Sequence, residues 1–171
     1  YTYFMLSKLL KKIALILGHN TATMSGRYRF IATNSVTGEH MFTTPWIENL
    51  VVNNAGRGVQ IVADRLVGIT TNDLVITKAK IGTGTTAPAD GDTDLQTSVF
   101  TKNSVASAGA SGNVASLSFF ITTTELANGT YTEFGIFAVN QLIARSIISP
   151  SYVKGTNQDT TVEYEITVAN S

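Results

Sequence analysis

The segment from Lys80 to Leu95, KIGTGTTAPADGDTDL, most limits what this chain can fold into. A helix cannot run through it, because Pro88 lacks a backbone donor and the three glycines of the segment carry an entropic cost in a helix. Apolar and polar residues alternate on both sides of it, over 74–81 and over 96–105. The pattern predicts a long ordered loop that joins two strands.

Alternation at a period of two continues along most of the chain and predicts a mainly β protein. Residues 27–32 and 40–43 are expected to form a hairpin around the turn-forming residues 34–38. Further strands are predicted at 73–81, 96–107, 114–124, 132–139, 142–148 and 160–168, with turns at 108–113, 127–129, 140–141 and 149–159. Since many strands with short connections favour two packed sheets, the expected fold is an antiparallel β-sandwich, formed by a single domain over 24–171.

One short helix is predicted within this domain, at about 54–67. Asn53 and Asn54 supply capping side chains, apolar residues recur at helical spacing from Val59 to Val67, and Gly68 follows as an end signal. The helix is expected to lie against a sheet.

Residues 1–23 differ from the rest because their apolar residues recur at helical spacing, with Ser7 and three lysines between them. The apolar stripe consists of Leu6, Leu9, Leu10, Ile13, Ile16 and Leu17. The pattern predicts an amphipathic helical arm that ends at Gly18 and packs on the body or on a neighbouring copy. The alternatives are a membrane-surface or signal segment, and a stretch that comes from a start upstream of Met24. The apolar run is too short to span a bilayer, so a membrane is not the partner that we expect.

Charge is scarce in this chain. Asp, Glu, Lys and Arg make up 14% of the residues, against about 25% in a typical domain, and the net charge is zero. Weak self-repulsion favours association between copies, and the neutral balance gives no indication of a nucleic-acid partner. The candidate interface residues are the apolar ones of the arm (Leu6, Leu9, Leu10, Ile13 and Leu17) together with Phe42 and Trp46.

Catalysis finds little support in the sequence. The chain has no cysteine, and its two histidines, His19 and His40, have no local partner. A dinucleotide-like G-x-G-x-x-A pattern runs from Gly82 to Ala87, but Pro88 prevents the helix that this fingerprint requires. We therefore expect a protein without catalytic residues or an organic cofactor.

The acidic loop raises the question of a metal. Asp90, Asp92 and Asp94 alternate on a flexible segment, and several carboxylates can converge on calcium. The spacing departs from an EF-hand loop, which would have Gly at Leu95 and Glu at Thr101. The alternative is a solvated turn whose Asp side chains accept hydrogen bonds from nearby amides.

A series of motifs in order resembles a family of small structural proteins of tailed bacteriophages. The motifs are an N-x-G-containing helix at 54–68, I-G-T-G-T-T-A-P…D-T-x-L at 81–95, E-F-G-I-F at 133–137 and the closing strand at 162–168. The resemblance covers about 26–168. The acidic D-G-D-T-D stretch and the basic arm depart from the family pattern.

This resemblance implies a component of the virion that has no enzymatic activity. We expect a self-associating protein, a trimer by preference, that contacts other virion proteins such as the major capsid or tail proteins. Its expected role is that of a capsid decoration (cement) protein or of a neck or tail component. The alternative is a receptor- or glycan-binding module of a tail fibre that depends on calcium at the acidic loop.

Overall fold

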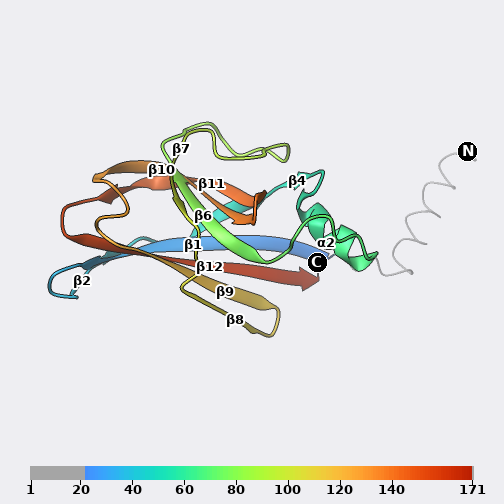
Figure 1. The fold of residues 1–171 in the computed structure, drawn as a ribbon, viewed down its shortest axis with the longest axis horizontal. Helices are drawn as coiled ribbons and strands as arrows, with labels where there is room; N and C mark the ends of the chain where they lie inside the picture. Colours follow the sequence, from blue (N-terminus) through green and yellow to red (C-terminus); the bar gives the residue numbers. More distant parts are fainter. Residues whose placement is uncertain (1–21, 171) are drawn as a thin grey trace, which may run out of the picture.

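The structure is a computed structural model that describes residues 22–170, and it is mainly β with one short helix (Figure 1). The strands are β1 (Ala22–Asn34), β2 (His40–Thr43), β3 (Ile47–Val51), β4 (Asn53–Asn54), β5 (Arg57–Gly58), β6 (Ile76–Gly82), β7 (Ser98–Lys102), β8 (Ser107–Ser111), β9 (Val114–Ile121), β10 (Gly129–Ala138), β11 (Gln141–Lys154) and β12 (Gln158–Asn170). The helix is α2 (Val59–Leu66).

A ten-stranded antiparallel sheet folds over on itself to make a sandwich-like body. Sheet A consists of β2, β1, β12, β9 and β8, and sheet B of β11, β10, β6 and β7. β3 joins them, because Ile47 pairs with Tyr28 in β1 while Val51 pairs with Ala144 in β11. One strand therefore belongs to both sheets and forms the corner of the body.

The core lies between the two sheets and is rich in aromatic rings. Tyr28 of β1 lies 4.4 Å from Phe134 of β10, and Phe30 stacks on Tyr152 of β11 at 4.3 Å, measured between ring centroids. Tyr28 and Tyr164 keep their hydroxyl groups hydrogen-bonded, to Ser146 and to Asn49 respectively. Alternation along the strands produces this core, because every second residue of a strand faces the other sheet. The predictions of a mainly β fold and of the hairpin formed by 27–32 and 40–43 are confirmed.

The predicted helix over 54–67 begins too early. Residues 53–58 form the small β4–β5 hairpin instead, and α2 starts only at Val59. Gly56 and Gly58 have positive φ angles, 69° and 51°, which are incompatible with a right-handed helix. The two asparagines therefore shape a hairpin and do not cap the helix.

Three predicted turns are corrected. The segment 108–113 is mostly strand, because β8 pairs with β9 around Gly112, whose φ is 58°. The predicted turn at 127–129 falls at the end of a longer loop over 122–128, because Gly129 already belongs to β10. β9 and β10 do not pair across this loop, since β9 pairs with β12 and β10 with β11. β11 continues past Pro150 into the predicted 149–159 turn. Its pairing with β10 shifts register between Tyr131 and Glu133, and Pro150 is opposite no ladder residue there, so its missing donor costs nothing.

The predicted arm falls almost entirely outside the residues that the structure describes. Its apolar stripe from Leu6 to Leu17 lies there, whereas residues 22 and 23 belong to β1. Within residues 22–170 no helix is long and apolar enough to span a membrane.

Candidate functional site

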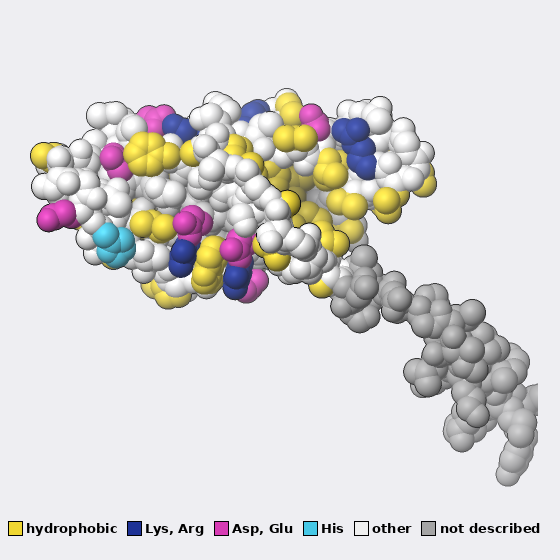
Figure 2. Space-filling view, turned by 90° about the horizontal axis from the view of Figure 1, so that it is seen from below, with side chains coloured by type: hydrophobic (Ala, Val, Ile, Leu, Met, Phe, Trp, Pro, Cys, Tyr) yellow, Lys and Arg dark blue, Asp and Glu magenta, His cyan; other side chains and the backbone are white. Residues whose placement is uncertain are grey.

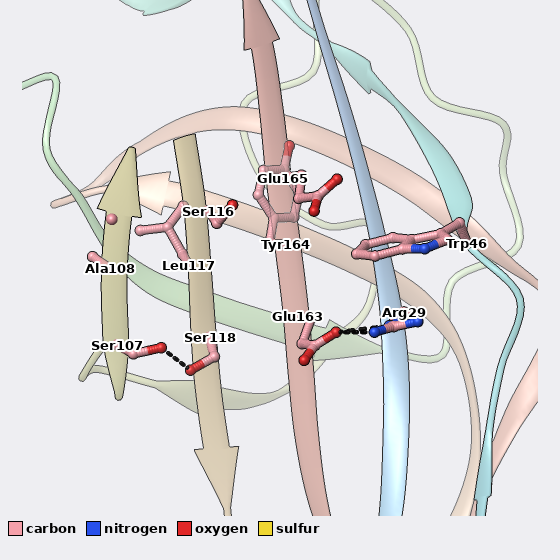
Figure 3. A pocket seen from close by; sticks show the side chains of 11 residues that line it. Arg29, Trp46, Ser107, Ala108, Ser116, Leu117, Ser118, Glu163, Tyr164 and Glu165 are labelled. Atoms are coloured by element: carbon pink, nitrogen blue, oxygen red, sulfur yellow. Dashed lines mark hydrogen bonds and ion pairs between the residues drawn. The ribbon is translucent and has the colours of Figure 1, made fainter. Parts of the chain in front are cut away.

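A shallow groove of about 520 Å³ crosses the outer face of sheet A (Figure 3). The strand register sets its lining in rows, since paired residues project to the same side of a sheet. One row across the strands is Ser107, Ser118, Glu163 and Arg29, and the next is Gly109, Ser116 and Glu165. Arg27 continues the second row but does not line the groove. The groove floor is therefore made of hydroxyl, carboxylate and guanidinium groups.

The charges of this face are paired within the face. Arg29 donates to Glu163 at 2.7 Å, and Arg27 donates to Glu165 at 2.7 Å. Such exposed pairs contribute little to stability, but they leave the groove close to electrically neutral. Basic and acidic side chains adjoin one another in the space-filling view of Figure 2 as well.

Trp46 lines the groove, and its ring lies across β1 beside Arg29 (Figure 3). The guanidinium carbons of Arg27 and Arg29 each lie 4.6 Å from the centre of its ring. A ligand that stacked on a covered part of this ring would have to displace a guanidinium group. The arrangement suits hydrogen bonding to a polar, neutral surface better than aromatic stacking.

Phe42, the other aromatic residue predicted at an interface, lies on β2 and pairs with the buried Ala32. It is therefore on the core face of sheet A, whereas Trp46 is on the outer face. Phe42 is 37% exposed, and its ring centre lies 6.0 Å from that of Tyr152. Phe42 therefore extends the core toward the surface, and the structure does not bring it together with Trp46.

The structure does not gather Asp90, Asp92 and Asp94 into one ligand set. Asp92 accepts a hydrogen bond from Arg145 at 2.6 Å, Asp94 pairs with Lys80 at 2.7 Å, and Asp90 is exposed. Among residues 22–170 no group of three or more His, Cys, Asp and Glu side chains is placed to hold a metal ion. Two of the three aspartates serve as partners of basic side chains.

A buried ion pair fixes the 82–97 loop to the outer face of sheet B. Glu133 is fully buried, and its carboxylate accepts from the backbone amides of Gln96 and Thr97 at 2.7 and 3.0 Å. Arg145, on the neighbouring strand, donates to the same carboxylate at 2.6 Å. Arg145 also donates to the carbonyl of Thr86 at 2.8 Å, so a single guanidinium holds both arms of the loop.

The charge of Arg145 is stabilised by this environment. Burial by itself opposes the charged form, but the hydrogen bonds with Asp92 and Glu133 outweigh it, so that the pKa of Arg145 is raised. The side chain of Arg145 is 2% exposed, and its guanidinium pairs with both Asp92 and Glu133. Its role is to hold the loop.

Two of the motif glycines are explained by the close approach of the loop to sheet B. A Cβ on Gly84 would lie 2.5 Å from Glu133 Oε2, and one on Gly135 would lie 2.6 Å from Leu95 Cδ1. Leu95 is buried in a small apolar cluster on the outer face of sheet B with Val52, Phe137 and Leu142. The loop motif and the E-F-G-I-F motif therefore form one loop-to-sheet clamp, which consists of Glu133, Arg145, Asp92, Gly84, Gly135 and Leu95.

The sequence reasoning missed Arg145 and Glu133. The available signal was a single arginine inside the apolar run Leu142–Ile148, and a glutamate that begins the run Phe134–Ala138. A lone charge in an apolar strand implies a buried partner of opposite charge. Glu133 and Arg145 lie twelve residues apart, on the two strands that the predicted 140–141 turn joins. The contribution of the loop has no such local signal, because Asp92 lies 53 residues before Arg145.

Calcium is expected to leave the thermal stability of this protein unchanged. Asp92 and Asp94 already bind Arg145 and Lys80, and a bound ion would have to break both contacts. The measurement is the unfolding temperature in millimolar CaCl₂ and in EGTA, with MgCl₂ as the control salt. A rise of several degrees that is specific to calcium, and that Asp90→Asn abolishes, would contradict this expectation.

Comparisons of the chain with protein-family models, with curated proteins and with solved structures find no match. The resemblance to tailed-phage proteins therefore rests on the motifs of the chain itself.

Proposed function

We propose that this chain is a non-enzymatic structural protein of a tailed-bacteriophage virion, and that it associates with copies of itself as a capsid decoration protein or as a neck or tail component. The motif resemblance supports the virion assignment. The self-association is carried by one observation, a concentration of exposed apolar side chains around α2.

Six of the fourteen large hydrophobic side chains that are exposed within residues 22–170 lie between positions 59 and 75. They are Val59, Leu66, Val67, Ile69, Leu74 and Val75, and we call them the α2 patch. Leu66 is 84% exposed and Val75 is 65% exposed. Hydrophobic side chains are visible at this end of the molecule in Figure 2. Large exposed apolar patches mark interaction surfaces, because their burial is favourable.

The rest of the surface is compatible with assembly. The clamp holds the long loop against sheet B, so that the body is a rigid unit and loses little conformational entropy when it associates. The outer face of sheet A has its arginines and glutamates paired, so that copies do not repel one another there.

Replacement of two patch residues by aspartate is expected to dissociate the oligomer. The chain should elute as a stable oligomer, with a trimer preferred, whereas Leu66→Asp/Val75→Asp should elute as a monomer at the same concentration. Each apolar side chain that is buried on association contributes about 1.5–3 kcal/mol, and an uncompensated buried carboxylate would oppose association further. The measurement is size-exclusion chromatography with light scattering.

The matched control is Val36→Asp. Val36 is 76% exposed, and it lies in the turn before β2, at the end of the molecule opposite to α2 (Figure 1). This variant should keep the oligomer, and all variants should keep the β-sheet circular-dichroism spectrum of the parent chain, which shows that each of them folds. A monomeric parent chain at tens of micromolar would contradict the proposed self-association.

The second candidate function is that of a receptor- or glycan-binding module. The observation that favours it is the neutral groove lined by Ser107, Ser116, Ser118, Glu163 and Glu165, whose groups can hydrogen-bond to sugar hydroxyls. Trp46 is the only tryptophan of the chain and lines this groove, so its fluorescence reports on the groove directly. A monomeric chain whose fluorescence saturates on titration with a neutral oligosaccharide would favour this candidate.

A further inference from the structure

We propose that the α2 patch of one copy receives the apolar stripe of residues 6–17 of a neighbouring copy. This inference rests on the proposed self-association and identifies the partner of its surface. The contact joins α2 to a segment whose sequence pattern is that of an amphipathic helix, so that two different surfaces of the same chain meet.

The helix α2 presents apolar residues on two sides. Ile61 points into the core and is fully buried, while Val59, Ala63 and Leu66 are exposed at i, i+4 and i+7 along the other side. A helix on a protein surface normally turns polar residues outward. An outward stripe with this spacing is typical of a helix that packs against a second helix.

Residues 6–17 carry a stripe with the same spacing. Leu6, Leu10, Ile13 and Leu17 follow one another at intervals of four, three and four residues. Side chains at these intervals form ridges that fit between those of another helix with the same repeat. The lysines at 8, 11 and 12 lie between the apolar positions, so that docking can leave them in water.

The N-terminal segment begins at the correct end of the molecule for this contact. β1 starts at Ala22, beside the end of β12 and at the end of the body that carries α2 (Figure 1). Four residues, Gly18 to Thr21, separate the stripe from β1, and they reach at most about 14 Å. In an assembly in which these ends meet, the segment of one copy is within reach of the patch on the next.

The neighbouring copy is assigned as the source of the segment for two reasons. Docking within one chain would cover both apolar surfaces in the monomer and would leave nothing to drive association through the patch. A contact between two α2 patches would leave the stripe of residues 6–17 exposed to water. Exchange between copies covers both surfaces, and because it joins unlike surfaces it can close into a ring such as a trimer.

Disulfide trapping tests this contact, because the chain contains no cysteine of its own. Two single-cysteine chains, Ile13→Cys with a solubility tag that changes its size and Leu66→Cys without a tag, are mixed and oxidised. A heterodimer of the two sizes is expected to form at least about ten-fold faster than in a control mixture of Ile13→Cys with Val36→Cys. A chain that carries both Ile13→Cys and Leu66→Cys is expected to give covalent dimers and larger species on a denaturing gel.

Two results would overturn the inference. Equal rates in the two mixtures would show that residue 13 does not reach the patch. A double-cysteine chain that forms only an internal disulfide would place the segment on its own body. Light scattering on the unmodified chain separates this failure from that of the proposed function: an oligomer without cross-linking contradicts only the contact, whereas a monomer contradicts both.

Discussion

Arg145→Ala is expected to lower the free energy of unfolding by about 3–5 kcal/mol, the cost of removing one partner of a buried ion pair. The substitution would leave the carboxylate of Glu133, which is fully buried, without its only basic partner among residues 22–170. It would also release the carbonyl of Thr86 and the carboxylate of Asp92, which Arg145 holds at 2.8 and 2.6 Å. The 82–97 loop should then detach from sheet B before the body unfolds.

Urea denaturation measures this loss, and limited proteolysis reports the detachment of the loop. The matched control is Arg29→Ala, which breaks a surface pair with Glu163 and should cost less than about 1 kcal/mol. A double variant, Arg145→Met with Glu133→Leu, is expected to recover much of the stability, because no charge is left buried. A loss below 1 kcal/mol in Arg145→Ala would contradict the role assigned to the clamp.

Stability is expected to fall steeply when the pH rises above about 10. Burial raises the pKa of the Tyr28 and Tyr164 hydroxyls above the ordinary value of 10.0, and their hydrogen bonds with Ser146 and Asn49 offset only part of this effect. The native state then keeps protons that the unfolded chain releases. Tyr28 and Tyr164 each lower the free energy of unfolding by about 1.4 kcal/mol per pH unit above 10, together by about 2.7 kcal/mol per unit. Burial also raises the pKa of Tyr152 and of Tyr131, so these two hydroxyls steepen the decline further.

Lys154 acts in the opposite direction but over a limited range. Burial lowers its pKa below 10.5, so that native Lys154 loses its proton first and stability rises with pH only up to about that value. The decline caused by the two tyrosines should therefore be clearest above pH 10.5.

Urea midpoints between pH 8 and 11.5 measure this dependence. Tyr28→Phe is expected to reduce the slope above pH 10.5 by about 1.4 kcal/mol per unit, since one of the buried hydroxyls that keep their protons is removed. An unchanged midpoint up to pH 11.5 would show that neither tyrosine is as well buried as the structure has it.

The fold class could be predicted from the sequence because alternation at period two depends only on local pattern. The strands from Val114 to Ile121 and from Gln158 to Asn170 were found near their true bounds for this reason. Their partners could not be found, because β1 pairs with a strand more than a hundred residues away. The pairing of β3 with both sheets likewise has no local signal. The start of Ile47–Val51 pairs with β1 and its end pairs with β11, but the sequence of both parts is that of an ordinary strand.

The acidic loop shows the same division between local and long-range information. Pro88 and the glycines correctly predicted a non-helical loop between two strands, but the function of its aspartates depends on Lys80 and Arg145. A carboxylate that binds a metal and one that binds a guanidinium have the same sequence pattern. Only the position of the basic residue in space distinguishes the two.

The pairing of the first and last described strands determines when sheet A can form during translation. β1 and β12 are hydrogen-bonded along their full thirteen residues, in the middle of sheet A. During translation β1 emerges first and must wait without its main partner until β12 has left the ribosome. Closure of so long a chain segment is entropically costly and slow, so that sheet A cannot be completed until β12 has been synthesised. Because the chain carries few charges, a partly synthesised chain whose β1 is still without β12 would be prone to associate with other copies before it folds. Correct assembly therefore depends on how soon β12 is synthesised.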